Sequence, residues 1–195
     1  MDIKLFFAIA SVLVLVVGYI PYLKDIFAGT TKPHAYTWLI WVVTQGTATA
    51  AAFYGGANWG VIGLASGTLM CGWIFLLSIK YGTKNVTRSD TIILLLALSA
   101  IAVWLLTNNP LYAVLMVTAI DGLGYIPTLR KTWQEPYSET VIFWFVMVVS
   151  TIFGILALGA FNWLTLPYLA VLVVLNMSVL AVCTLRRRHV PKPEA

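Results

Sequence analysis

Charged residues are scarce in this sequence. Lysine, arginine, aspartate and glutamate make up 10% of the 195 residues, whereas a soluble domain carries about 25%. Hydrophobic residues make up 61%, and the mean hydropathy is +0.91. This composition excludes a soluble globular domain as the main part of the chain and predicts a membrane protein.

Residues with metal-binding and catalytic chemistry are also few. The two cysteines, Cys71 and Cys183, lie within apolar runs, which favours buried thiols over a disulfide or a metal site. His34 and His189 lie in a loop and in the tail. The sequence has no His/Cys metal spacing, P-loop or nucleophile elbow. We therefore expect no enzyme activity, no metal and no cofactor.

What the sequence has instead is long runs without charge. A transmembrane helix needs about 20 mainly apolar residues. The runs predict seven such helices. Two of the runs are long enough for two helices each, and Gly55–Asn58 and Gly159–Asn162 divide them. The predicted spans lie within residues 5–23, 35–79 (two helices), 91–107, 111–129 and 140–185 (two helices).

The chain is also an internal duplication. GYIPYLK at Gly18–Lys24 recurs as GYIPTLR at Gly124–Arg130, 106 positions later. At the same offset, WLIWVVT (38–44) matches WFVMVVS (144–150), and near Gly55 the offset falls to 104, so that Gly55, Asn58 and Trp59 match Gly159, Asn162 and Trp163. A register held over this length is the signature of a repeat.

The seven predicted spans are grouped as three, one and three, and membrane topology explains the single helix between the two copies. Three crossings leave the chain on the far side of the bilayer, so a second copy in the same orientation needs one extra crossing. We therefore expect an all-α membrane fold of two parallel three-helix bundles related by an axis along the membrane normal. The expected units are residues 1–85, the linker helix at 86–108, and residues 109–195 with a basic tail.

Loop charges give the expected orientation. In the seven-span arrangement one side receives only Lys4, and the other side receives all the remaining lysines and arginines. Positive residues favour the cytoplasmic side. We expect a multi-pass protein of the inner (plasma) membrane, with its N-terminus outside and its C-terminus in the cytoplasm. The net charge of +5 is explained by topology, so we expect no nucleic-acid partner.

Pro21 and Pro127 occupy equivalent places in the two copies, near the cytoplasmic ends of their helices. A proline inside a helix removes a backbone donor and kinks the helix. With Gly18 and Gly124 beside them, the two prolines are candidate hinges, one per copy. The alternative is that each proline only ends its helix.

Asp121 is an acid inside a predicted span, and its repeat counterpart is Leu15. No lysine or arginine lies within any span to pair with it, and a buried carboxylate is costly unless it is paired, wetted or protonated. Asp121 is therefore a candidate substrate-binding residue, either as an acceptor for solute hydroxyls or as a group that couples transport to protons. The alternative is a structural role, with a protonated acid bonded to a backbone carbonyl.

The 3+1+3 arrangement, with a proline motif ending the first helix of each triplet, resembles the SWEET and PQ-loop superfamily. The segment Ile20–Asp25, followed by Gly29–Pro33, is similar to its first PQ-loop motif. The resemblance implies a cavity between the two triplets that opens alternately to each side. It also implies that Asn176, on the last helix, faces substrate, with Gly72 as its counterpart; an interhelical amide bond is the alternative.

Three further residues complete the candidate substrate site. Trp41 and Trp73 lie deep in their predicted spans, where an aromatic face can stack on a sugar ring; packing is the alternative. Gln45 is a weaker polar candidate in the second span.

The expected function is that of a membrane transporter for a small polar solute, with a sugar as the leading class. The alternatives are a proton-coupled amino-acid or vitamin transporter of PQ-loop type, and a receptor with this fold that transports nothing. The expected partners are the solute, the lipid bilayer and, in a homo-oligomer, further copies of the chain.

Overall fold

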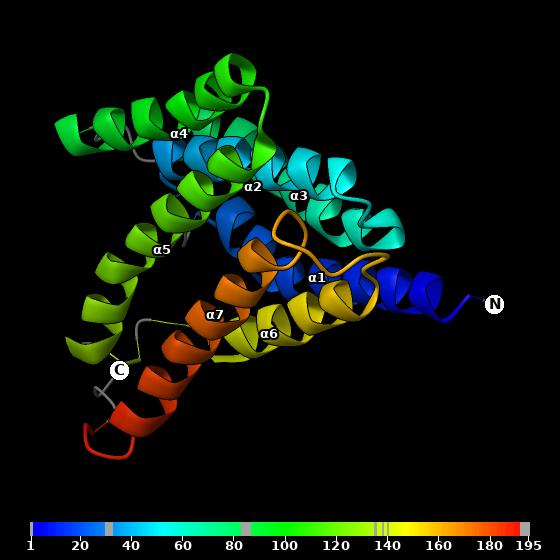
Figure 1. Cartoon of the computed structure of the whole chain (residues 1–195). Coiled ribbons are helices and arrows are strands. Elements are labelled where there is room, and N and C mark those ends of the chain that lie inside the picture. Colours follow the sequence, from blue (N-terminus) through cyan, green and yellow to red (C-terminus); the bar gives the residue numbers. More distant parts are fainter. Residues whose placement is uncertain are drawn as a thin grey trace.

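The computed structural model describes residues 2–29, 33–82, 87–134, 136–137, 139 and 141–191, without the side chains of residues 126, 127, 130 and 131. Seven α-helices and one short 3₁₀-helix form the regular structure of these residues (Figure 1). They are α1 (Ile3–Phe27), α2 (Ala35–Tyr54), η1 (Asn58–Gly60), α3 (Val61–Tyr81), α4 (Arg88–Thr107), α5 (Pro110–Gln134), α6 (Val141–Leu156) and α7 (Pro167–Arg186).

Four helical segments are long and apolar enough to cross a membrane: α1, Asn58–Tyr81, α4 and α7. Large apolar side chains face outward, such as Leu105 at 78% exposure and Leu106 at 87%. Surfaces of this kind are disfavoured in water and fit hydrocarbon. The described helices therefore indicate a membrane protein, while the full set of seven spans stays a prediction.

Polar residues set α2 apart from these four segments. Its 20 residues include Thr37, Thr44, Gln45, Thr47 and Thr49, which lower its hydropathy. Thr47 and Thr49 each donate a hydrogen bond at 2.7 Å to the carbonyl oxygen four residues earlier. A hydroxyl bonded in this way is satisfied within its own helix, so these threonines are compatible with an apolar environment.

Helix packing follows the sequence repeat. α3 packs on both α1 and α2, and α7 packs in the same way on α5 and α6. Between the copies, α1 packs on α6 and α2 packs on α5, so the first helix of each copy contacts the second helix of the other. α4 packs on α5 and α2 at the outside of this arrangement (Figure 1).

Hydrogen bonds join the α2–α3 and α6–α7 connections at one end of the molecule. The Gly159 amide donates to the Ala57 carbonyl at 2.8 Å, and the Asn162 side-chain amide donates to the Gly55 carbonyl at 2.8 Å. Lys4 adds a 3.2 Å bond to the Gly159 carbonyl from the start of α1. The equivalent connections of the two copies and the N-terminus therefore lie at the same end.

The opposite end carries the basic residues that follow α7. Arg187 donates from Nε to the Pro136 carbonyl at 2.9 Å and from Nη2 to the Glu139 carbonyl at 2.7 Å. Arg186 lies over the ring of Trp133, 4.7 Å from its centroid. These contacts fix the end of α7 against the α5–α6 connection.

Neither candidate hinge proline ends its helix. α1 continues through Pro21 to Phe27, and α5 continues through Pro127 to Gln134. The backbone thus places both prolines inside helices, whereas the Pro127 side chain lies outside the described part of the structure.

The two glycines beside these prolines have different surroundings. A β-carbon at Gly18 would lie 2.7 Å from Cε of Met147 and 2.8 Å from Cγ1 of Val146, both on α6. A β-carbon at Gly124 would meet nothing within 4 Å. The first glycine is therefore part of the close α1–α6 contact between the copies, and its counterpart faces open space.

Candidate functional site

A cavity of about 100 Å³ lies between the two copies. Three helices of each copy line it, namely α1, α2 and α3 from the first and α5, α6 and α7 from the second. The linker helix α4 contributes none of the lining residues. Of the five predicted substrate-binding residues, four line this cavity: Trp41, Gln45, Asp121 and Asn176.

Asp121 is held by two hydroxyl groups from different helices. Thr44 on α2 donates to Oδ1 at 2.7 Å, and Tyr168 on α7 donates to Oδ2. The aspartate is only 3% exposed. The carboxylate therefore accepts hydrogen bonds from two hydroxyl groups, whereas the structural alternative given by the sequence was a bond to a backbone carbonyl. A carboxylate has about four acceptor positions, so these bonds leave it able to accept more.

Tyr168 contacts the candidate site residue Asp121, although nothing in the sequence predicted this contact. It lies in the first turn of α7 and is 2% exposed. A tyrosine near the end of an apolar span is typical of the membrane interface. The matching part of the first copy has Gly63 and Leu64, so the repeat gives no sign of a hydroxyl here. The contact with Asp121 is visible only in the structure.

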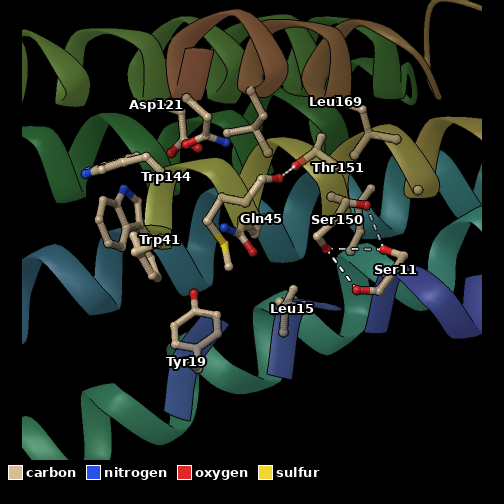
Figure 2. Close-up of a pocket in the computed structure, with 18 of the residues that line it drawn as sticks. Ser11, Leu15, Tyr19, Trp41, Gln45, Asp121, Trp144, Ser150, Thr151 and Leu169 are labelled. Carbon is tan, nitrogen blue, oxygen red and sulfur yellow. Dashed lines mark hydrogen bonds between the residues drawn. The ribbon is translucent and has the colours of Figure 1, made fainter. Parts of the chain in front are cut away.

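The repeat counterpart of Thr44 makes the equivalent link between the copies. Ser150 on α6 donates to the Ser11 carbonyl at 2.9 Å, and Ser11 on α1 donates to the Ser150 carbonyl at 3.0 Å. Figure 2 shows this reciprocal pair at one side of the cavity, with Asp121 on the other. Hydroxyl bonds thus cross both interfaces between the copies, and only one interface includes an acid.

Asn176 lines the cavity and is bonded to Tyr125. The Tyr125 hydroxyl donates to Asn176 Oδ1 at 3.0 Å, which joins α5 to α7. An interhelical bond of Asn176 was the alternative to a substrate contact. The structure shows such a bond, and Asn176 also lines the cavity. In the first copy the counterpart of Tyr125 is Tyr19, which neighbours Cys71 in a buried cluster. Cys71, one residue before the predicted counterpart Gly72, thus lies beside the tyrosine of the first copy as Asn176 lies beside that of the second; the pairing with Gly72 stays a prediction.

Gln45 presents an amide to the cavity from α2. None of the hydrogen bonds among the described residues involves this side-chain amide, and Figure 2 shows it near the middle of the cavity. A β-carbon at Gly67 would lie 2.9 Å from Gln45 Oε1. Glycine at position 67 therefore leaves room for the Gln45 side chain, which can both donate to and accept from a polar solute.

The two candidate tryptophans have different locations. Trp41 lines the cavity and packs edge-on against Trp38, with ring centroids 4.9 Å apart. Trp73 does not line the cavity and is 49% exposed on the outside of α3. The prediction that Trp73 contacts a substrate here needs correction, because this side chain points away from the interface between the copies. Trp144, whose repeat counterpart is Trp38, does line the cavity.

The chemistry available in the cavity is thus one carboxylate, two amides, several hydroxyls and a set of aromatic rings. Among the described residues, no group of three histidine, cysteine, aspartate or glutamate side chains is placed to hold a metal ion. Comparisons of this chain with protein-family models, with curated proteins and with solved structures each give no match. The cavity between the two copies is therefore the feature of this chain that bears on its function.

Proposed function

We propose that this chain is a membrane transporter that moves a small polar solute by alternating access through the cavity between its two three-helix bundles. The observation that carries the proposal is the position of the cavity, which three helices of each copy line together. In transporters built from repeats, the solute site lies at the interface between the repeats. A rearrangement of one bundle against the other would then open the cavity to either side.

In this proposal all seven helices span the bilayer, with the N-terminus outside and the C-terminus in the cytoplasm of a cell with an inner membrane. The joined α2–α3 and α6–α7 connections would form the outer end. The hydrogen bonds from Gly159 and Asn162 across these connections would close that end. The basic residues after α7 would lie at the cytoplasmic surface.

We place the chain in the SWEET and PQ-loop superfamily as part of this proposal. Membership of the chain in that superfamily would favour a sugar as the solute. Asp121 also supports a second candidate, a proton-coupled amino-acid or vitamin transporter, because a carboxylate in the cavity is a group that can bind and release a proton. A receptor that binds a solute without moving it is the third candidate, since the same cavity would serve both functions.

Flux into proteoliposomes tests the proposal. The full chain is reconstituted, and uptake of labelled sugars, amino acids, amines and vitamins is measured with and without an imposed pH gradient. Saturable uptake of one solute class is the expected result, and its response to the gradient separates the first candidate from the second. If every solute that binds the detergent-solubilised protein fails to enter the vesicles, the receptor is correct and transport is wrong.

A further inference from the structure

Aromatic rings enclose one side of the cavity. Six of the lining residues are aromatic: Tyr19, Trp38, Trp41, Tyr125, Phe143 and Trp144. They come from α1, α2, α5 and α6, so both copies contribute. The rings are therefore brought together by the association of the two copies.

Three pairs of these rings meet close to edge to face. Trp38 and Trp41 cross at 89°, Phe143 and Trp144 at 81°, and Tyr19 and Phe143 at 83°. Edge-to-face contact is a common geometry of packed aromatic rings, and here the rings in such contact also line the cavity. An enclosure of aromatic faces is the arrangement that binds quaternary and other organic ammonium groups.

The cavity also contains a carboxyl group, that of Asp121, and no cationic side chain is among the described residues that line it. Asp121 accepts hydrogen bonds from two neutral hydroxyls, and no lysine, arginine or histidine is among the lining residues. Figure 2 shows Trp41 and Trp144 on the same side of the cavity as Asp121. In surroundings of low dielectric, a carboxylate attracts a cation much more strongly than it would in water.

From the rings and the charge together, we propose that the solute of this cavity is an organic ammonium cation. The ammonium group would lie against the rings of Trp41 and Trp144 with Asp121 as its counter-ion, and the Gln45 amide would bond a polar substituent. This inference rests on the proposed function, because it takes the cavity to be the solute site. It replaces the sugar with a charged solute of similar size.

The chemistry of the cavity favours this cation over the alternatives. A neutral sugar could donate to the acceptor positions of Asp121 that Thr44 and Tyr168 leave free, but it would bring no positive charge to the carboxylate. A divalent metal ion prefers several oxygen ligands from carboxylates or carbonyls, and here a single carboxylate is set among rings. An acidic solute would be repelled by Asp121. An ammonium cation alone uses both the charge and the aromatic faces.

Binding to the full-length protein in detergent tests the proposal. Tetramethylammonium and choline are titrated at constant ionic strength against sodium chloride, with calorimetry as the readout. The same titration uses 3,3-dimethylbutan-1-ol, which has the shape of choline without its charge, and glucose. We expect saturable binding of the two cations, with the neutral alcohol and glucose at least tenfold weaker.

Matched variants locate the binding. Trp41→Leu and Asp121→Asn should each raise the Kd for tetramethylammonium about tenfold or more, because each removes one of the three groups that the cation would contact. Trp73→Leu, a tryptophan outside the cavity, should leave the Kd unchanged. Asp2→Asn should also leave it unchanged, because asparagine can still cap α1.

The outcomes separate the two proposals. Equal binding of choline and its neutral analogue, binding of glucose alone, or no ammonium binding would each overturn the cation inference. Cation binding that the Trp41 and Asp121 variants do not weaken would overturn it as well. Cation binding without flux into vesicles would support the inference and contradict transport. Sugar flux without ammonium binding would support transport and contradict the inference.

Discussion

Tyr168 donates a hydrogen bond from the first turn of α7 to the Asp121 carboxylate on α5. Thr44 donates to the other carboxylate oxygen from α2. Thr44 belongs to the first copy and Tyr168 to the second, so a single acid connects the two bundles. A movement of one bundle against the other would therefore change the bonding of Asp121, and this link couples the acid to the conformation of the protein.

Removing the Tyr168 hydroxyl tests that link. Tyr168→Phe should lower stability by about 1–3 kcal/mol, because a buried charged acceptor loses one of its donors. The thermal unfolding temperature in detergent measures the effect. Tyr54→Phe, at an exposed tyrosine, is the control and should leave the temperature unchanged. An unfolding temperature for Tyr168→Phe equal to that of the unaltered protein would contradict the contact.

Neutralising the acid tests its functional role. Asp121→Asn should abolish transport or uncouple it from the pH gradient, because the variant keeps the size of the side chain and loses its charge. Uptake into proteoliposomes measures this, and a normal elution profile in size-exclusion chromatography checks that the variant still inserts and folds. Unchanged flux would remove Asp121 from the site. Asp2→Asn, outside the cavity, should transport normally.

The hinge hypothesis concerns the rate of the conformational change. Pro21→Ala and Pro127→Ala should each slow turnover more than they weaken solute binding, because alanine restores the hydrogen bond that proline omits and stiffens the helix. Parallel measurements of flux and of equilibrium binding separate the two effects. Pro167→Ala is the matched control, since a proline in the first turn of a helix omits no bond. A loss of affinity with normal turnover would argue against hinges.

The two glycines of the repeat should differ in their tolerance of a side chain. Gly18→Leu should destabilise the protein by about 1–3 kcal/mol, because overpacking forces neighbouring side chains apart, and Met147 and Val146 lie within reach of a β-carbon. Gly124→Leu should cost nothing, because its β-carbon meets open space. Thermal unfolding of the two variants, measured side by side, checks the difference. Equal losses would contradict the asymmetric packing.

Orientation in the membrane is tested by labelling single cysteines in intact cells. In a chain whose buried Cys71 and Cys183 are replaced by serine, Phe161→Cys should react with a membrane-impermeant maleimide. His189→Cys should react only after the membrane is permeabilised. Both positions are exposed, so accessibility within the protein does not limit either reaction. The reverse pattern would invert the proposed topology.

Charge patterning predicted the helices well because charge-free runs are costly to place anywhere but in hydrocarbon. The predicted break at Gly55–Asn58 and the gap between the predicted spans 91–107 and 111–129 coincide with backbone that helices do not use: φ is positive at Gly56, Asn58 and Asn108. The buried acid was also identifiable, since a carboxylate in an apolar run needs an explanation.

The side of each helix that faces the cavity, and the side that faces lipid, could not be predicted in the same way. Lipid is as apolar as a protein core, so a membrane helix need not have a polar outer face. Trp73 and Trp41 lie in equally apolar surroundings in the sequence, yet one faces outward and the other the cavity. The contacts of Tyr168 with Asp121 and of Cys71 with Tyr19 could not be predicted for a related reason, because each is made with a partner on another helix.

The equivalence of Thr44 and Ser150 has a consequence for the symmetry of the cavity. In a dimer of two first halves, Leu15 of each half would face Thr44 of the other at both interfaces. In a dimer of two second halves, Asp121 of each half would face Ser150 of the other. Two halves joined in one polypeptide can differ at such positions. The cavity therefore has a single carboxyl group on one side of the repeat axis, an asymmetry that a homodimer of either half would lack.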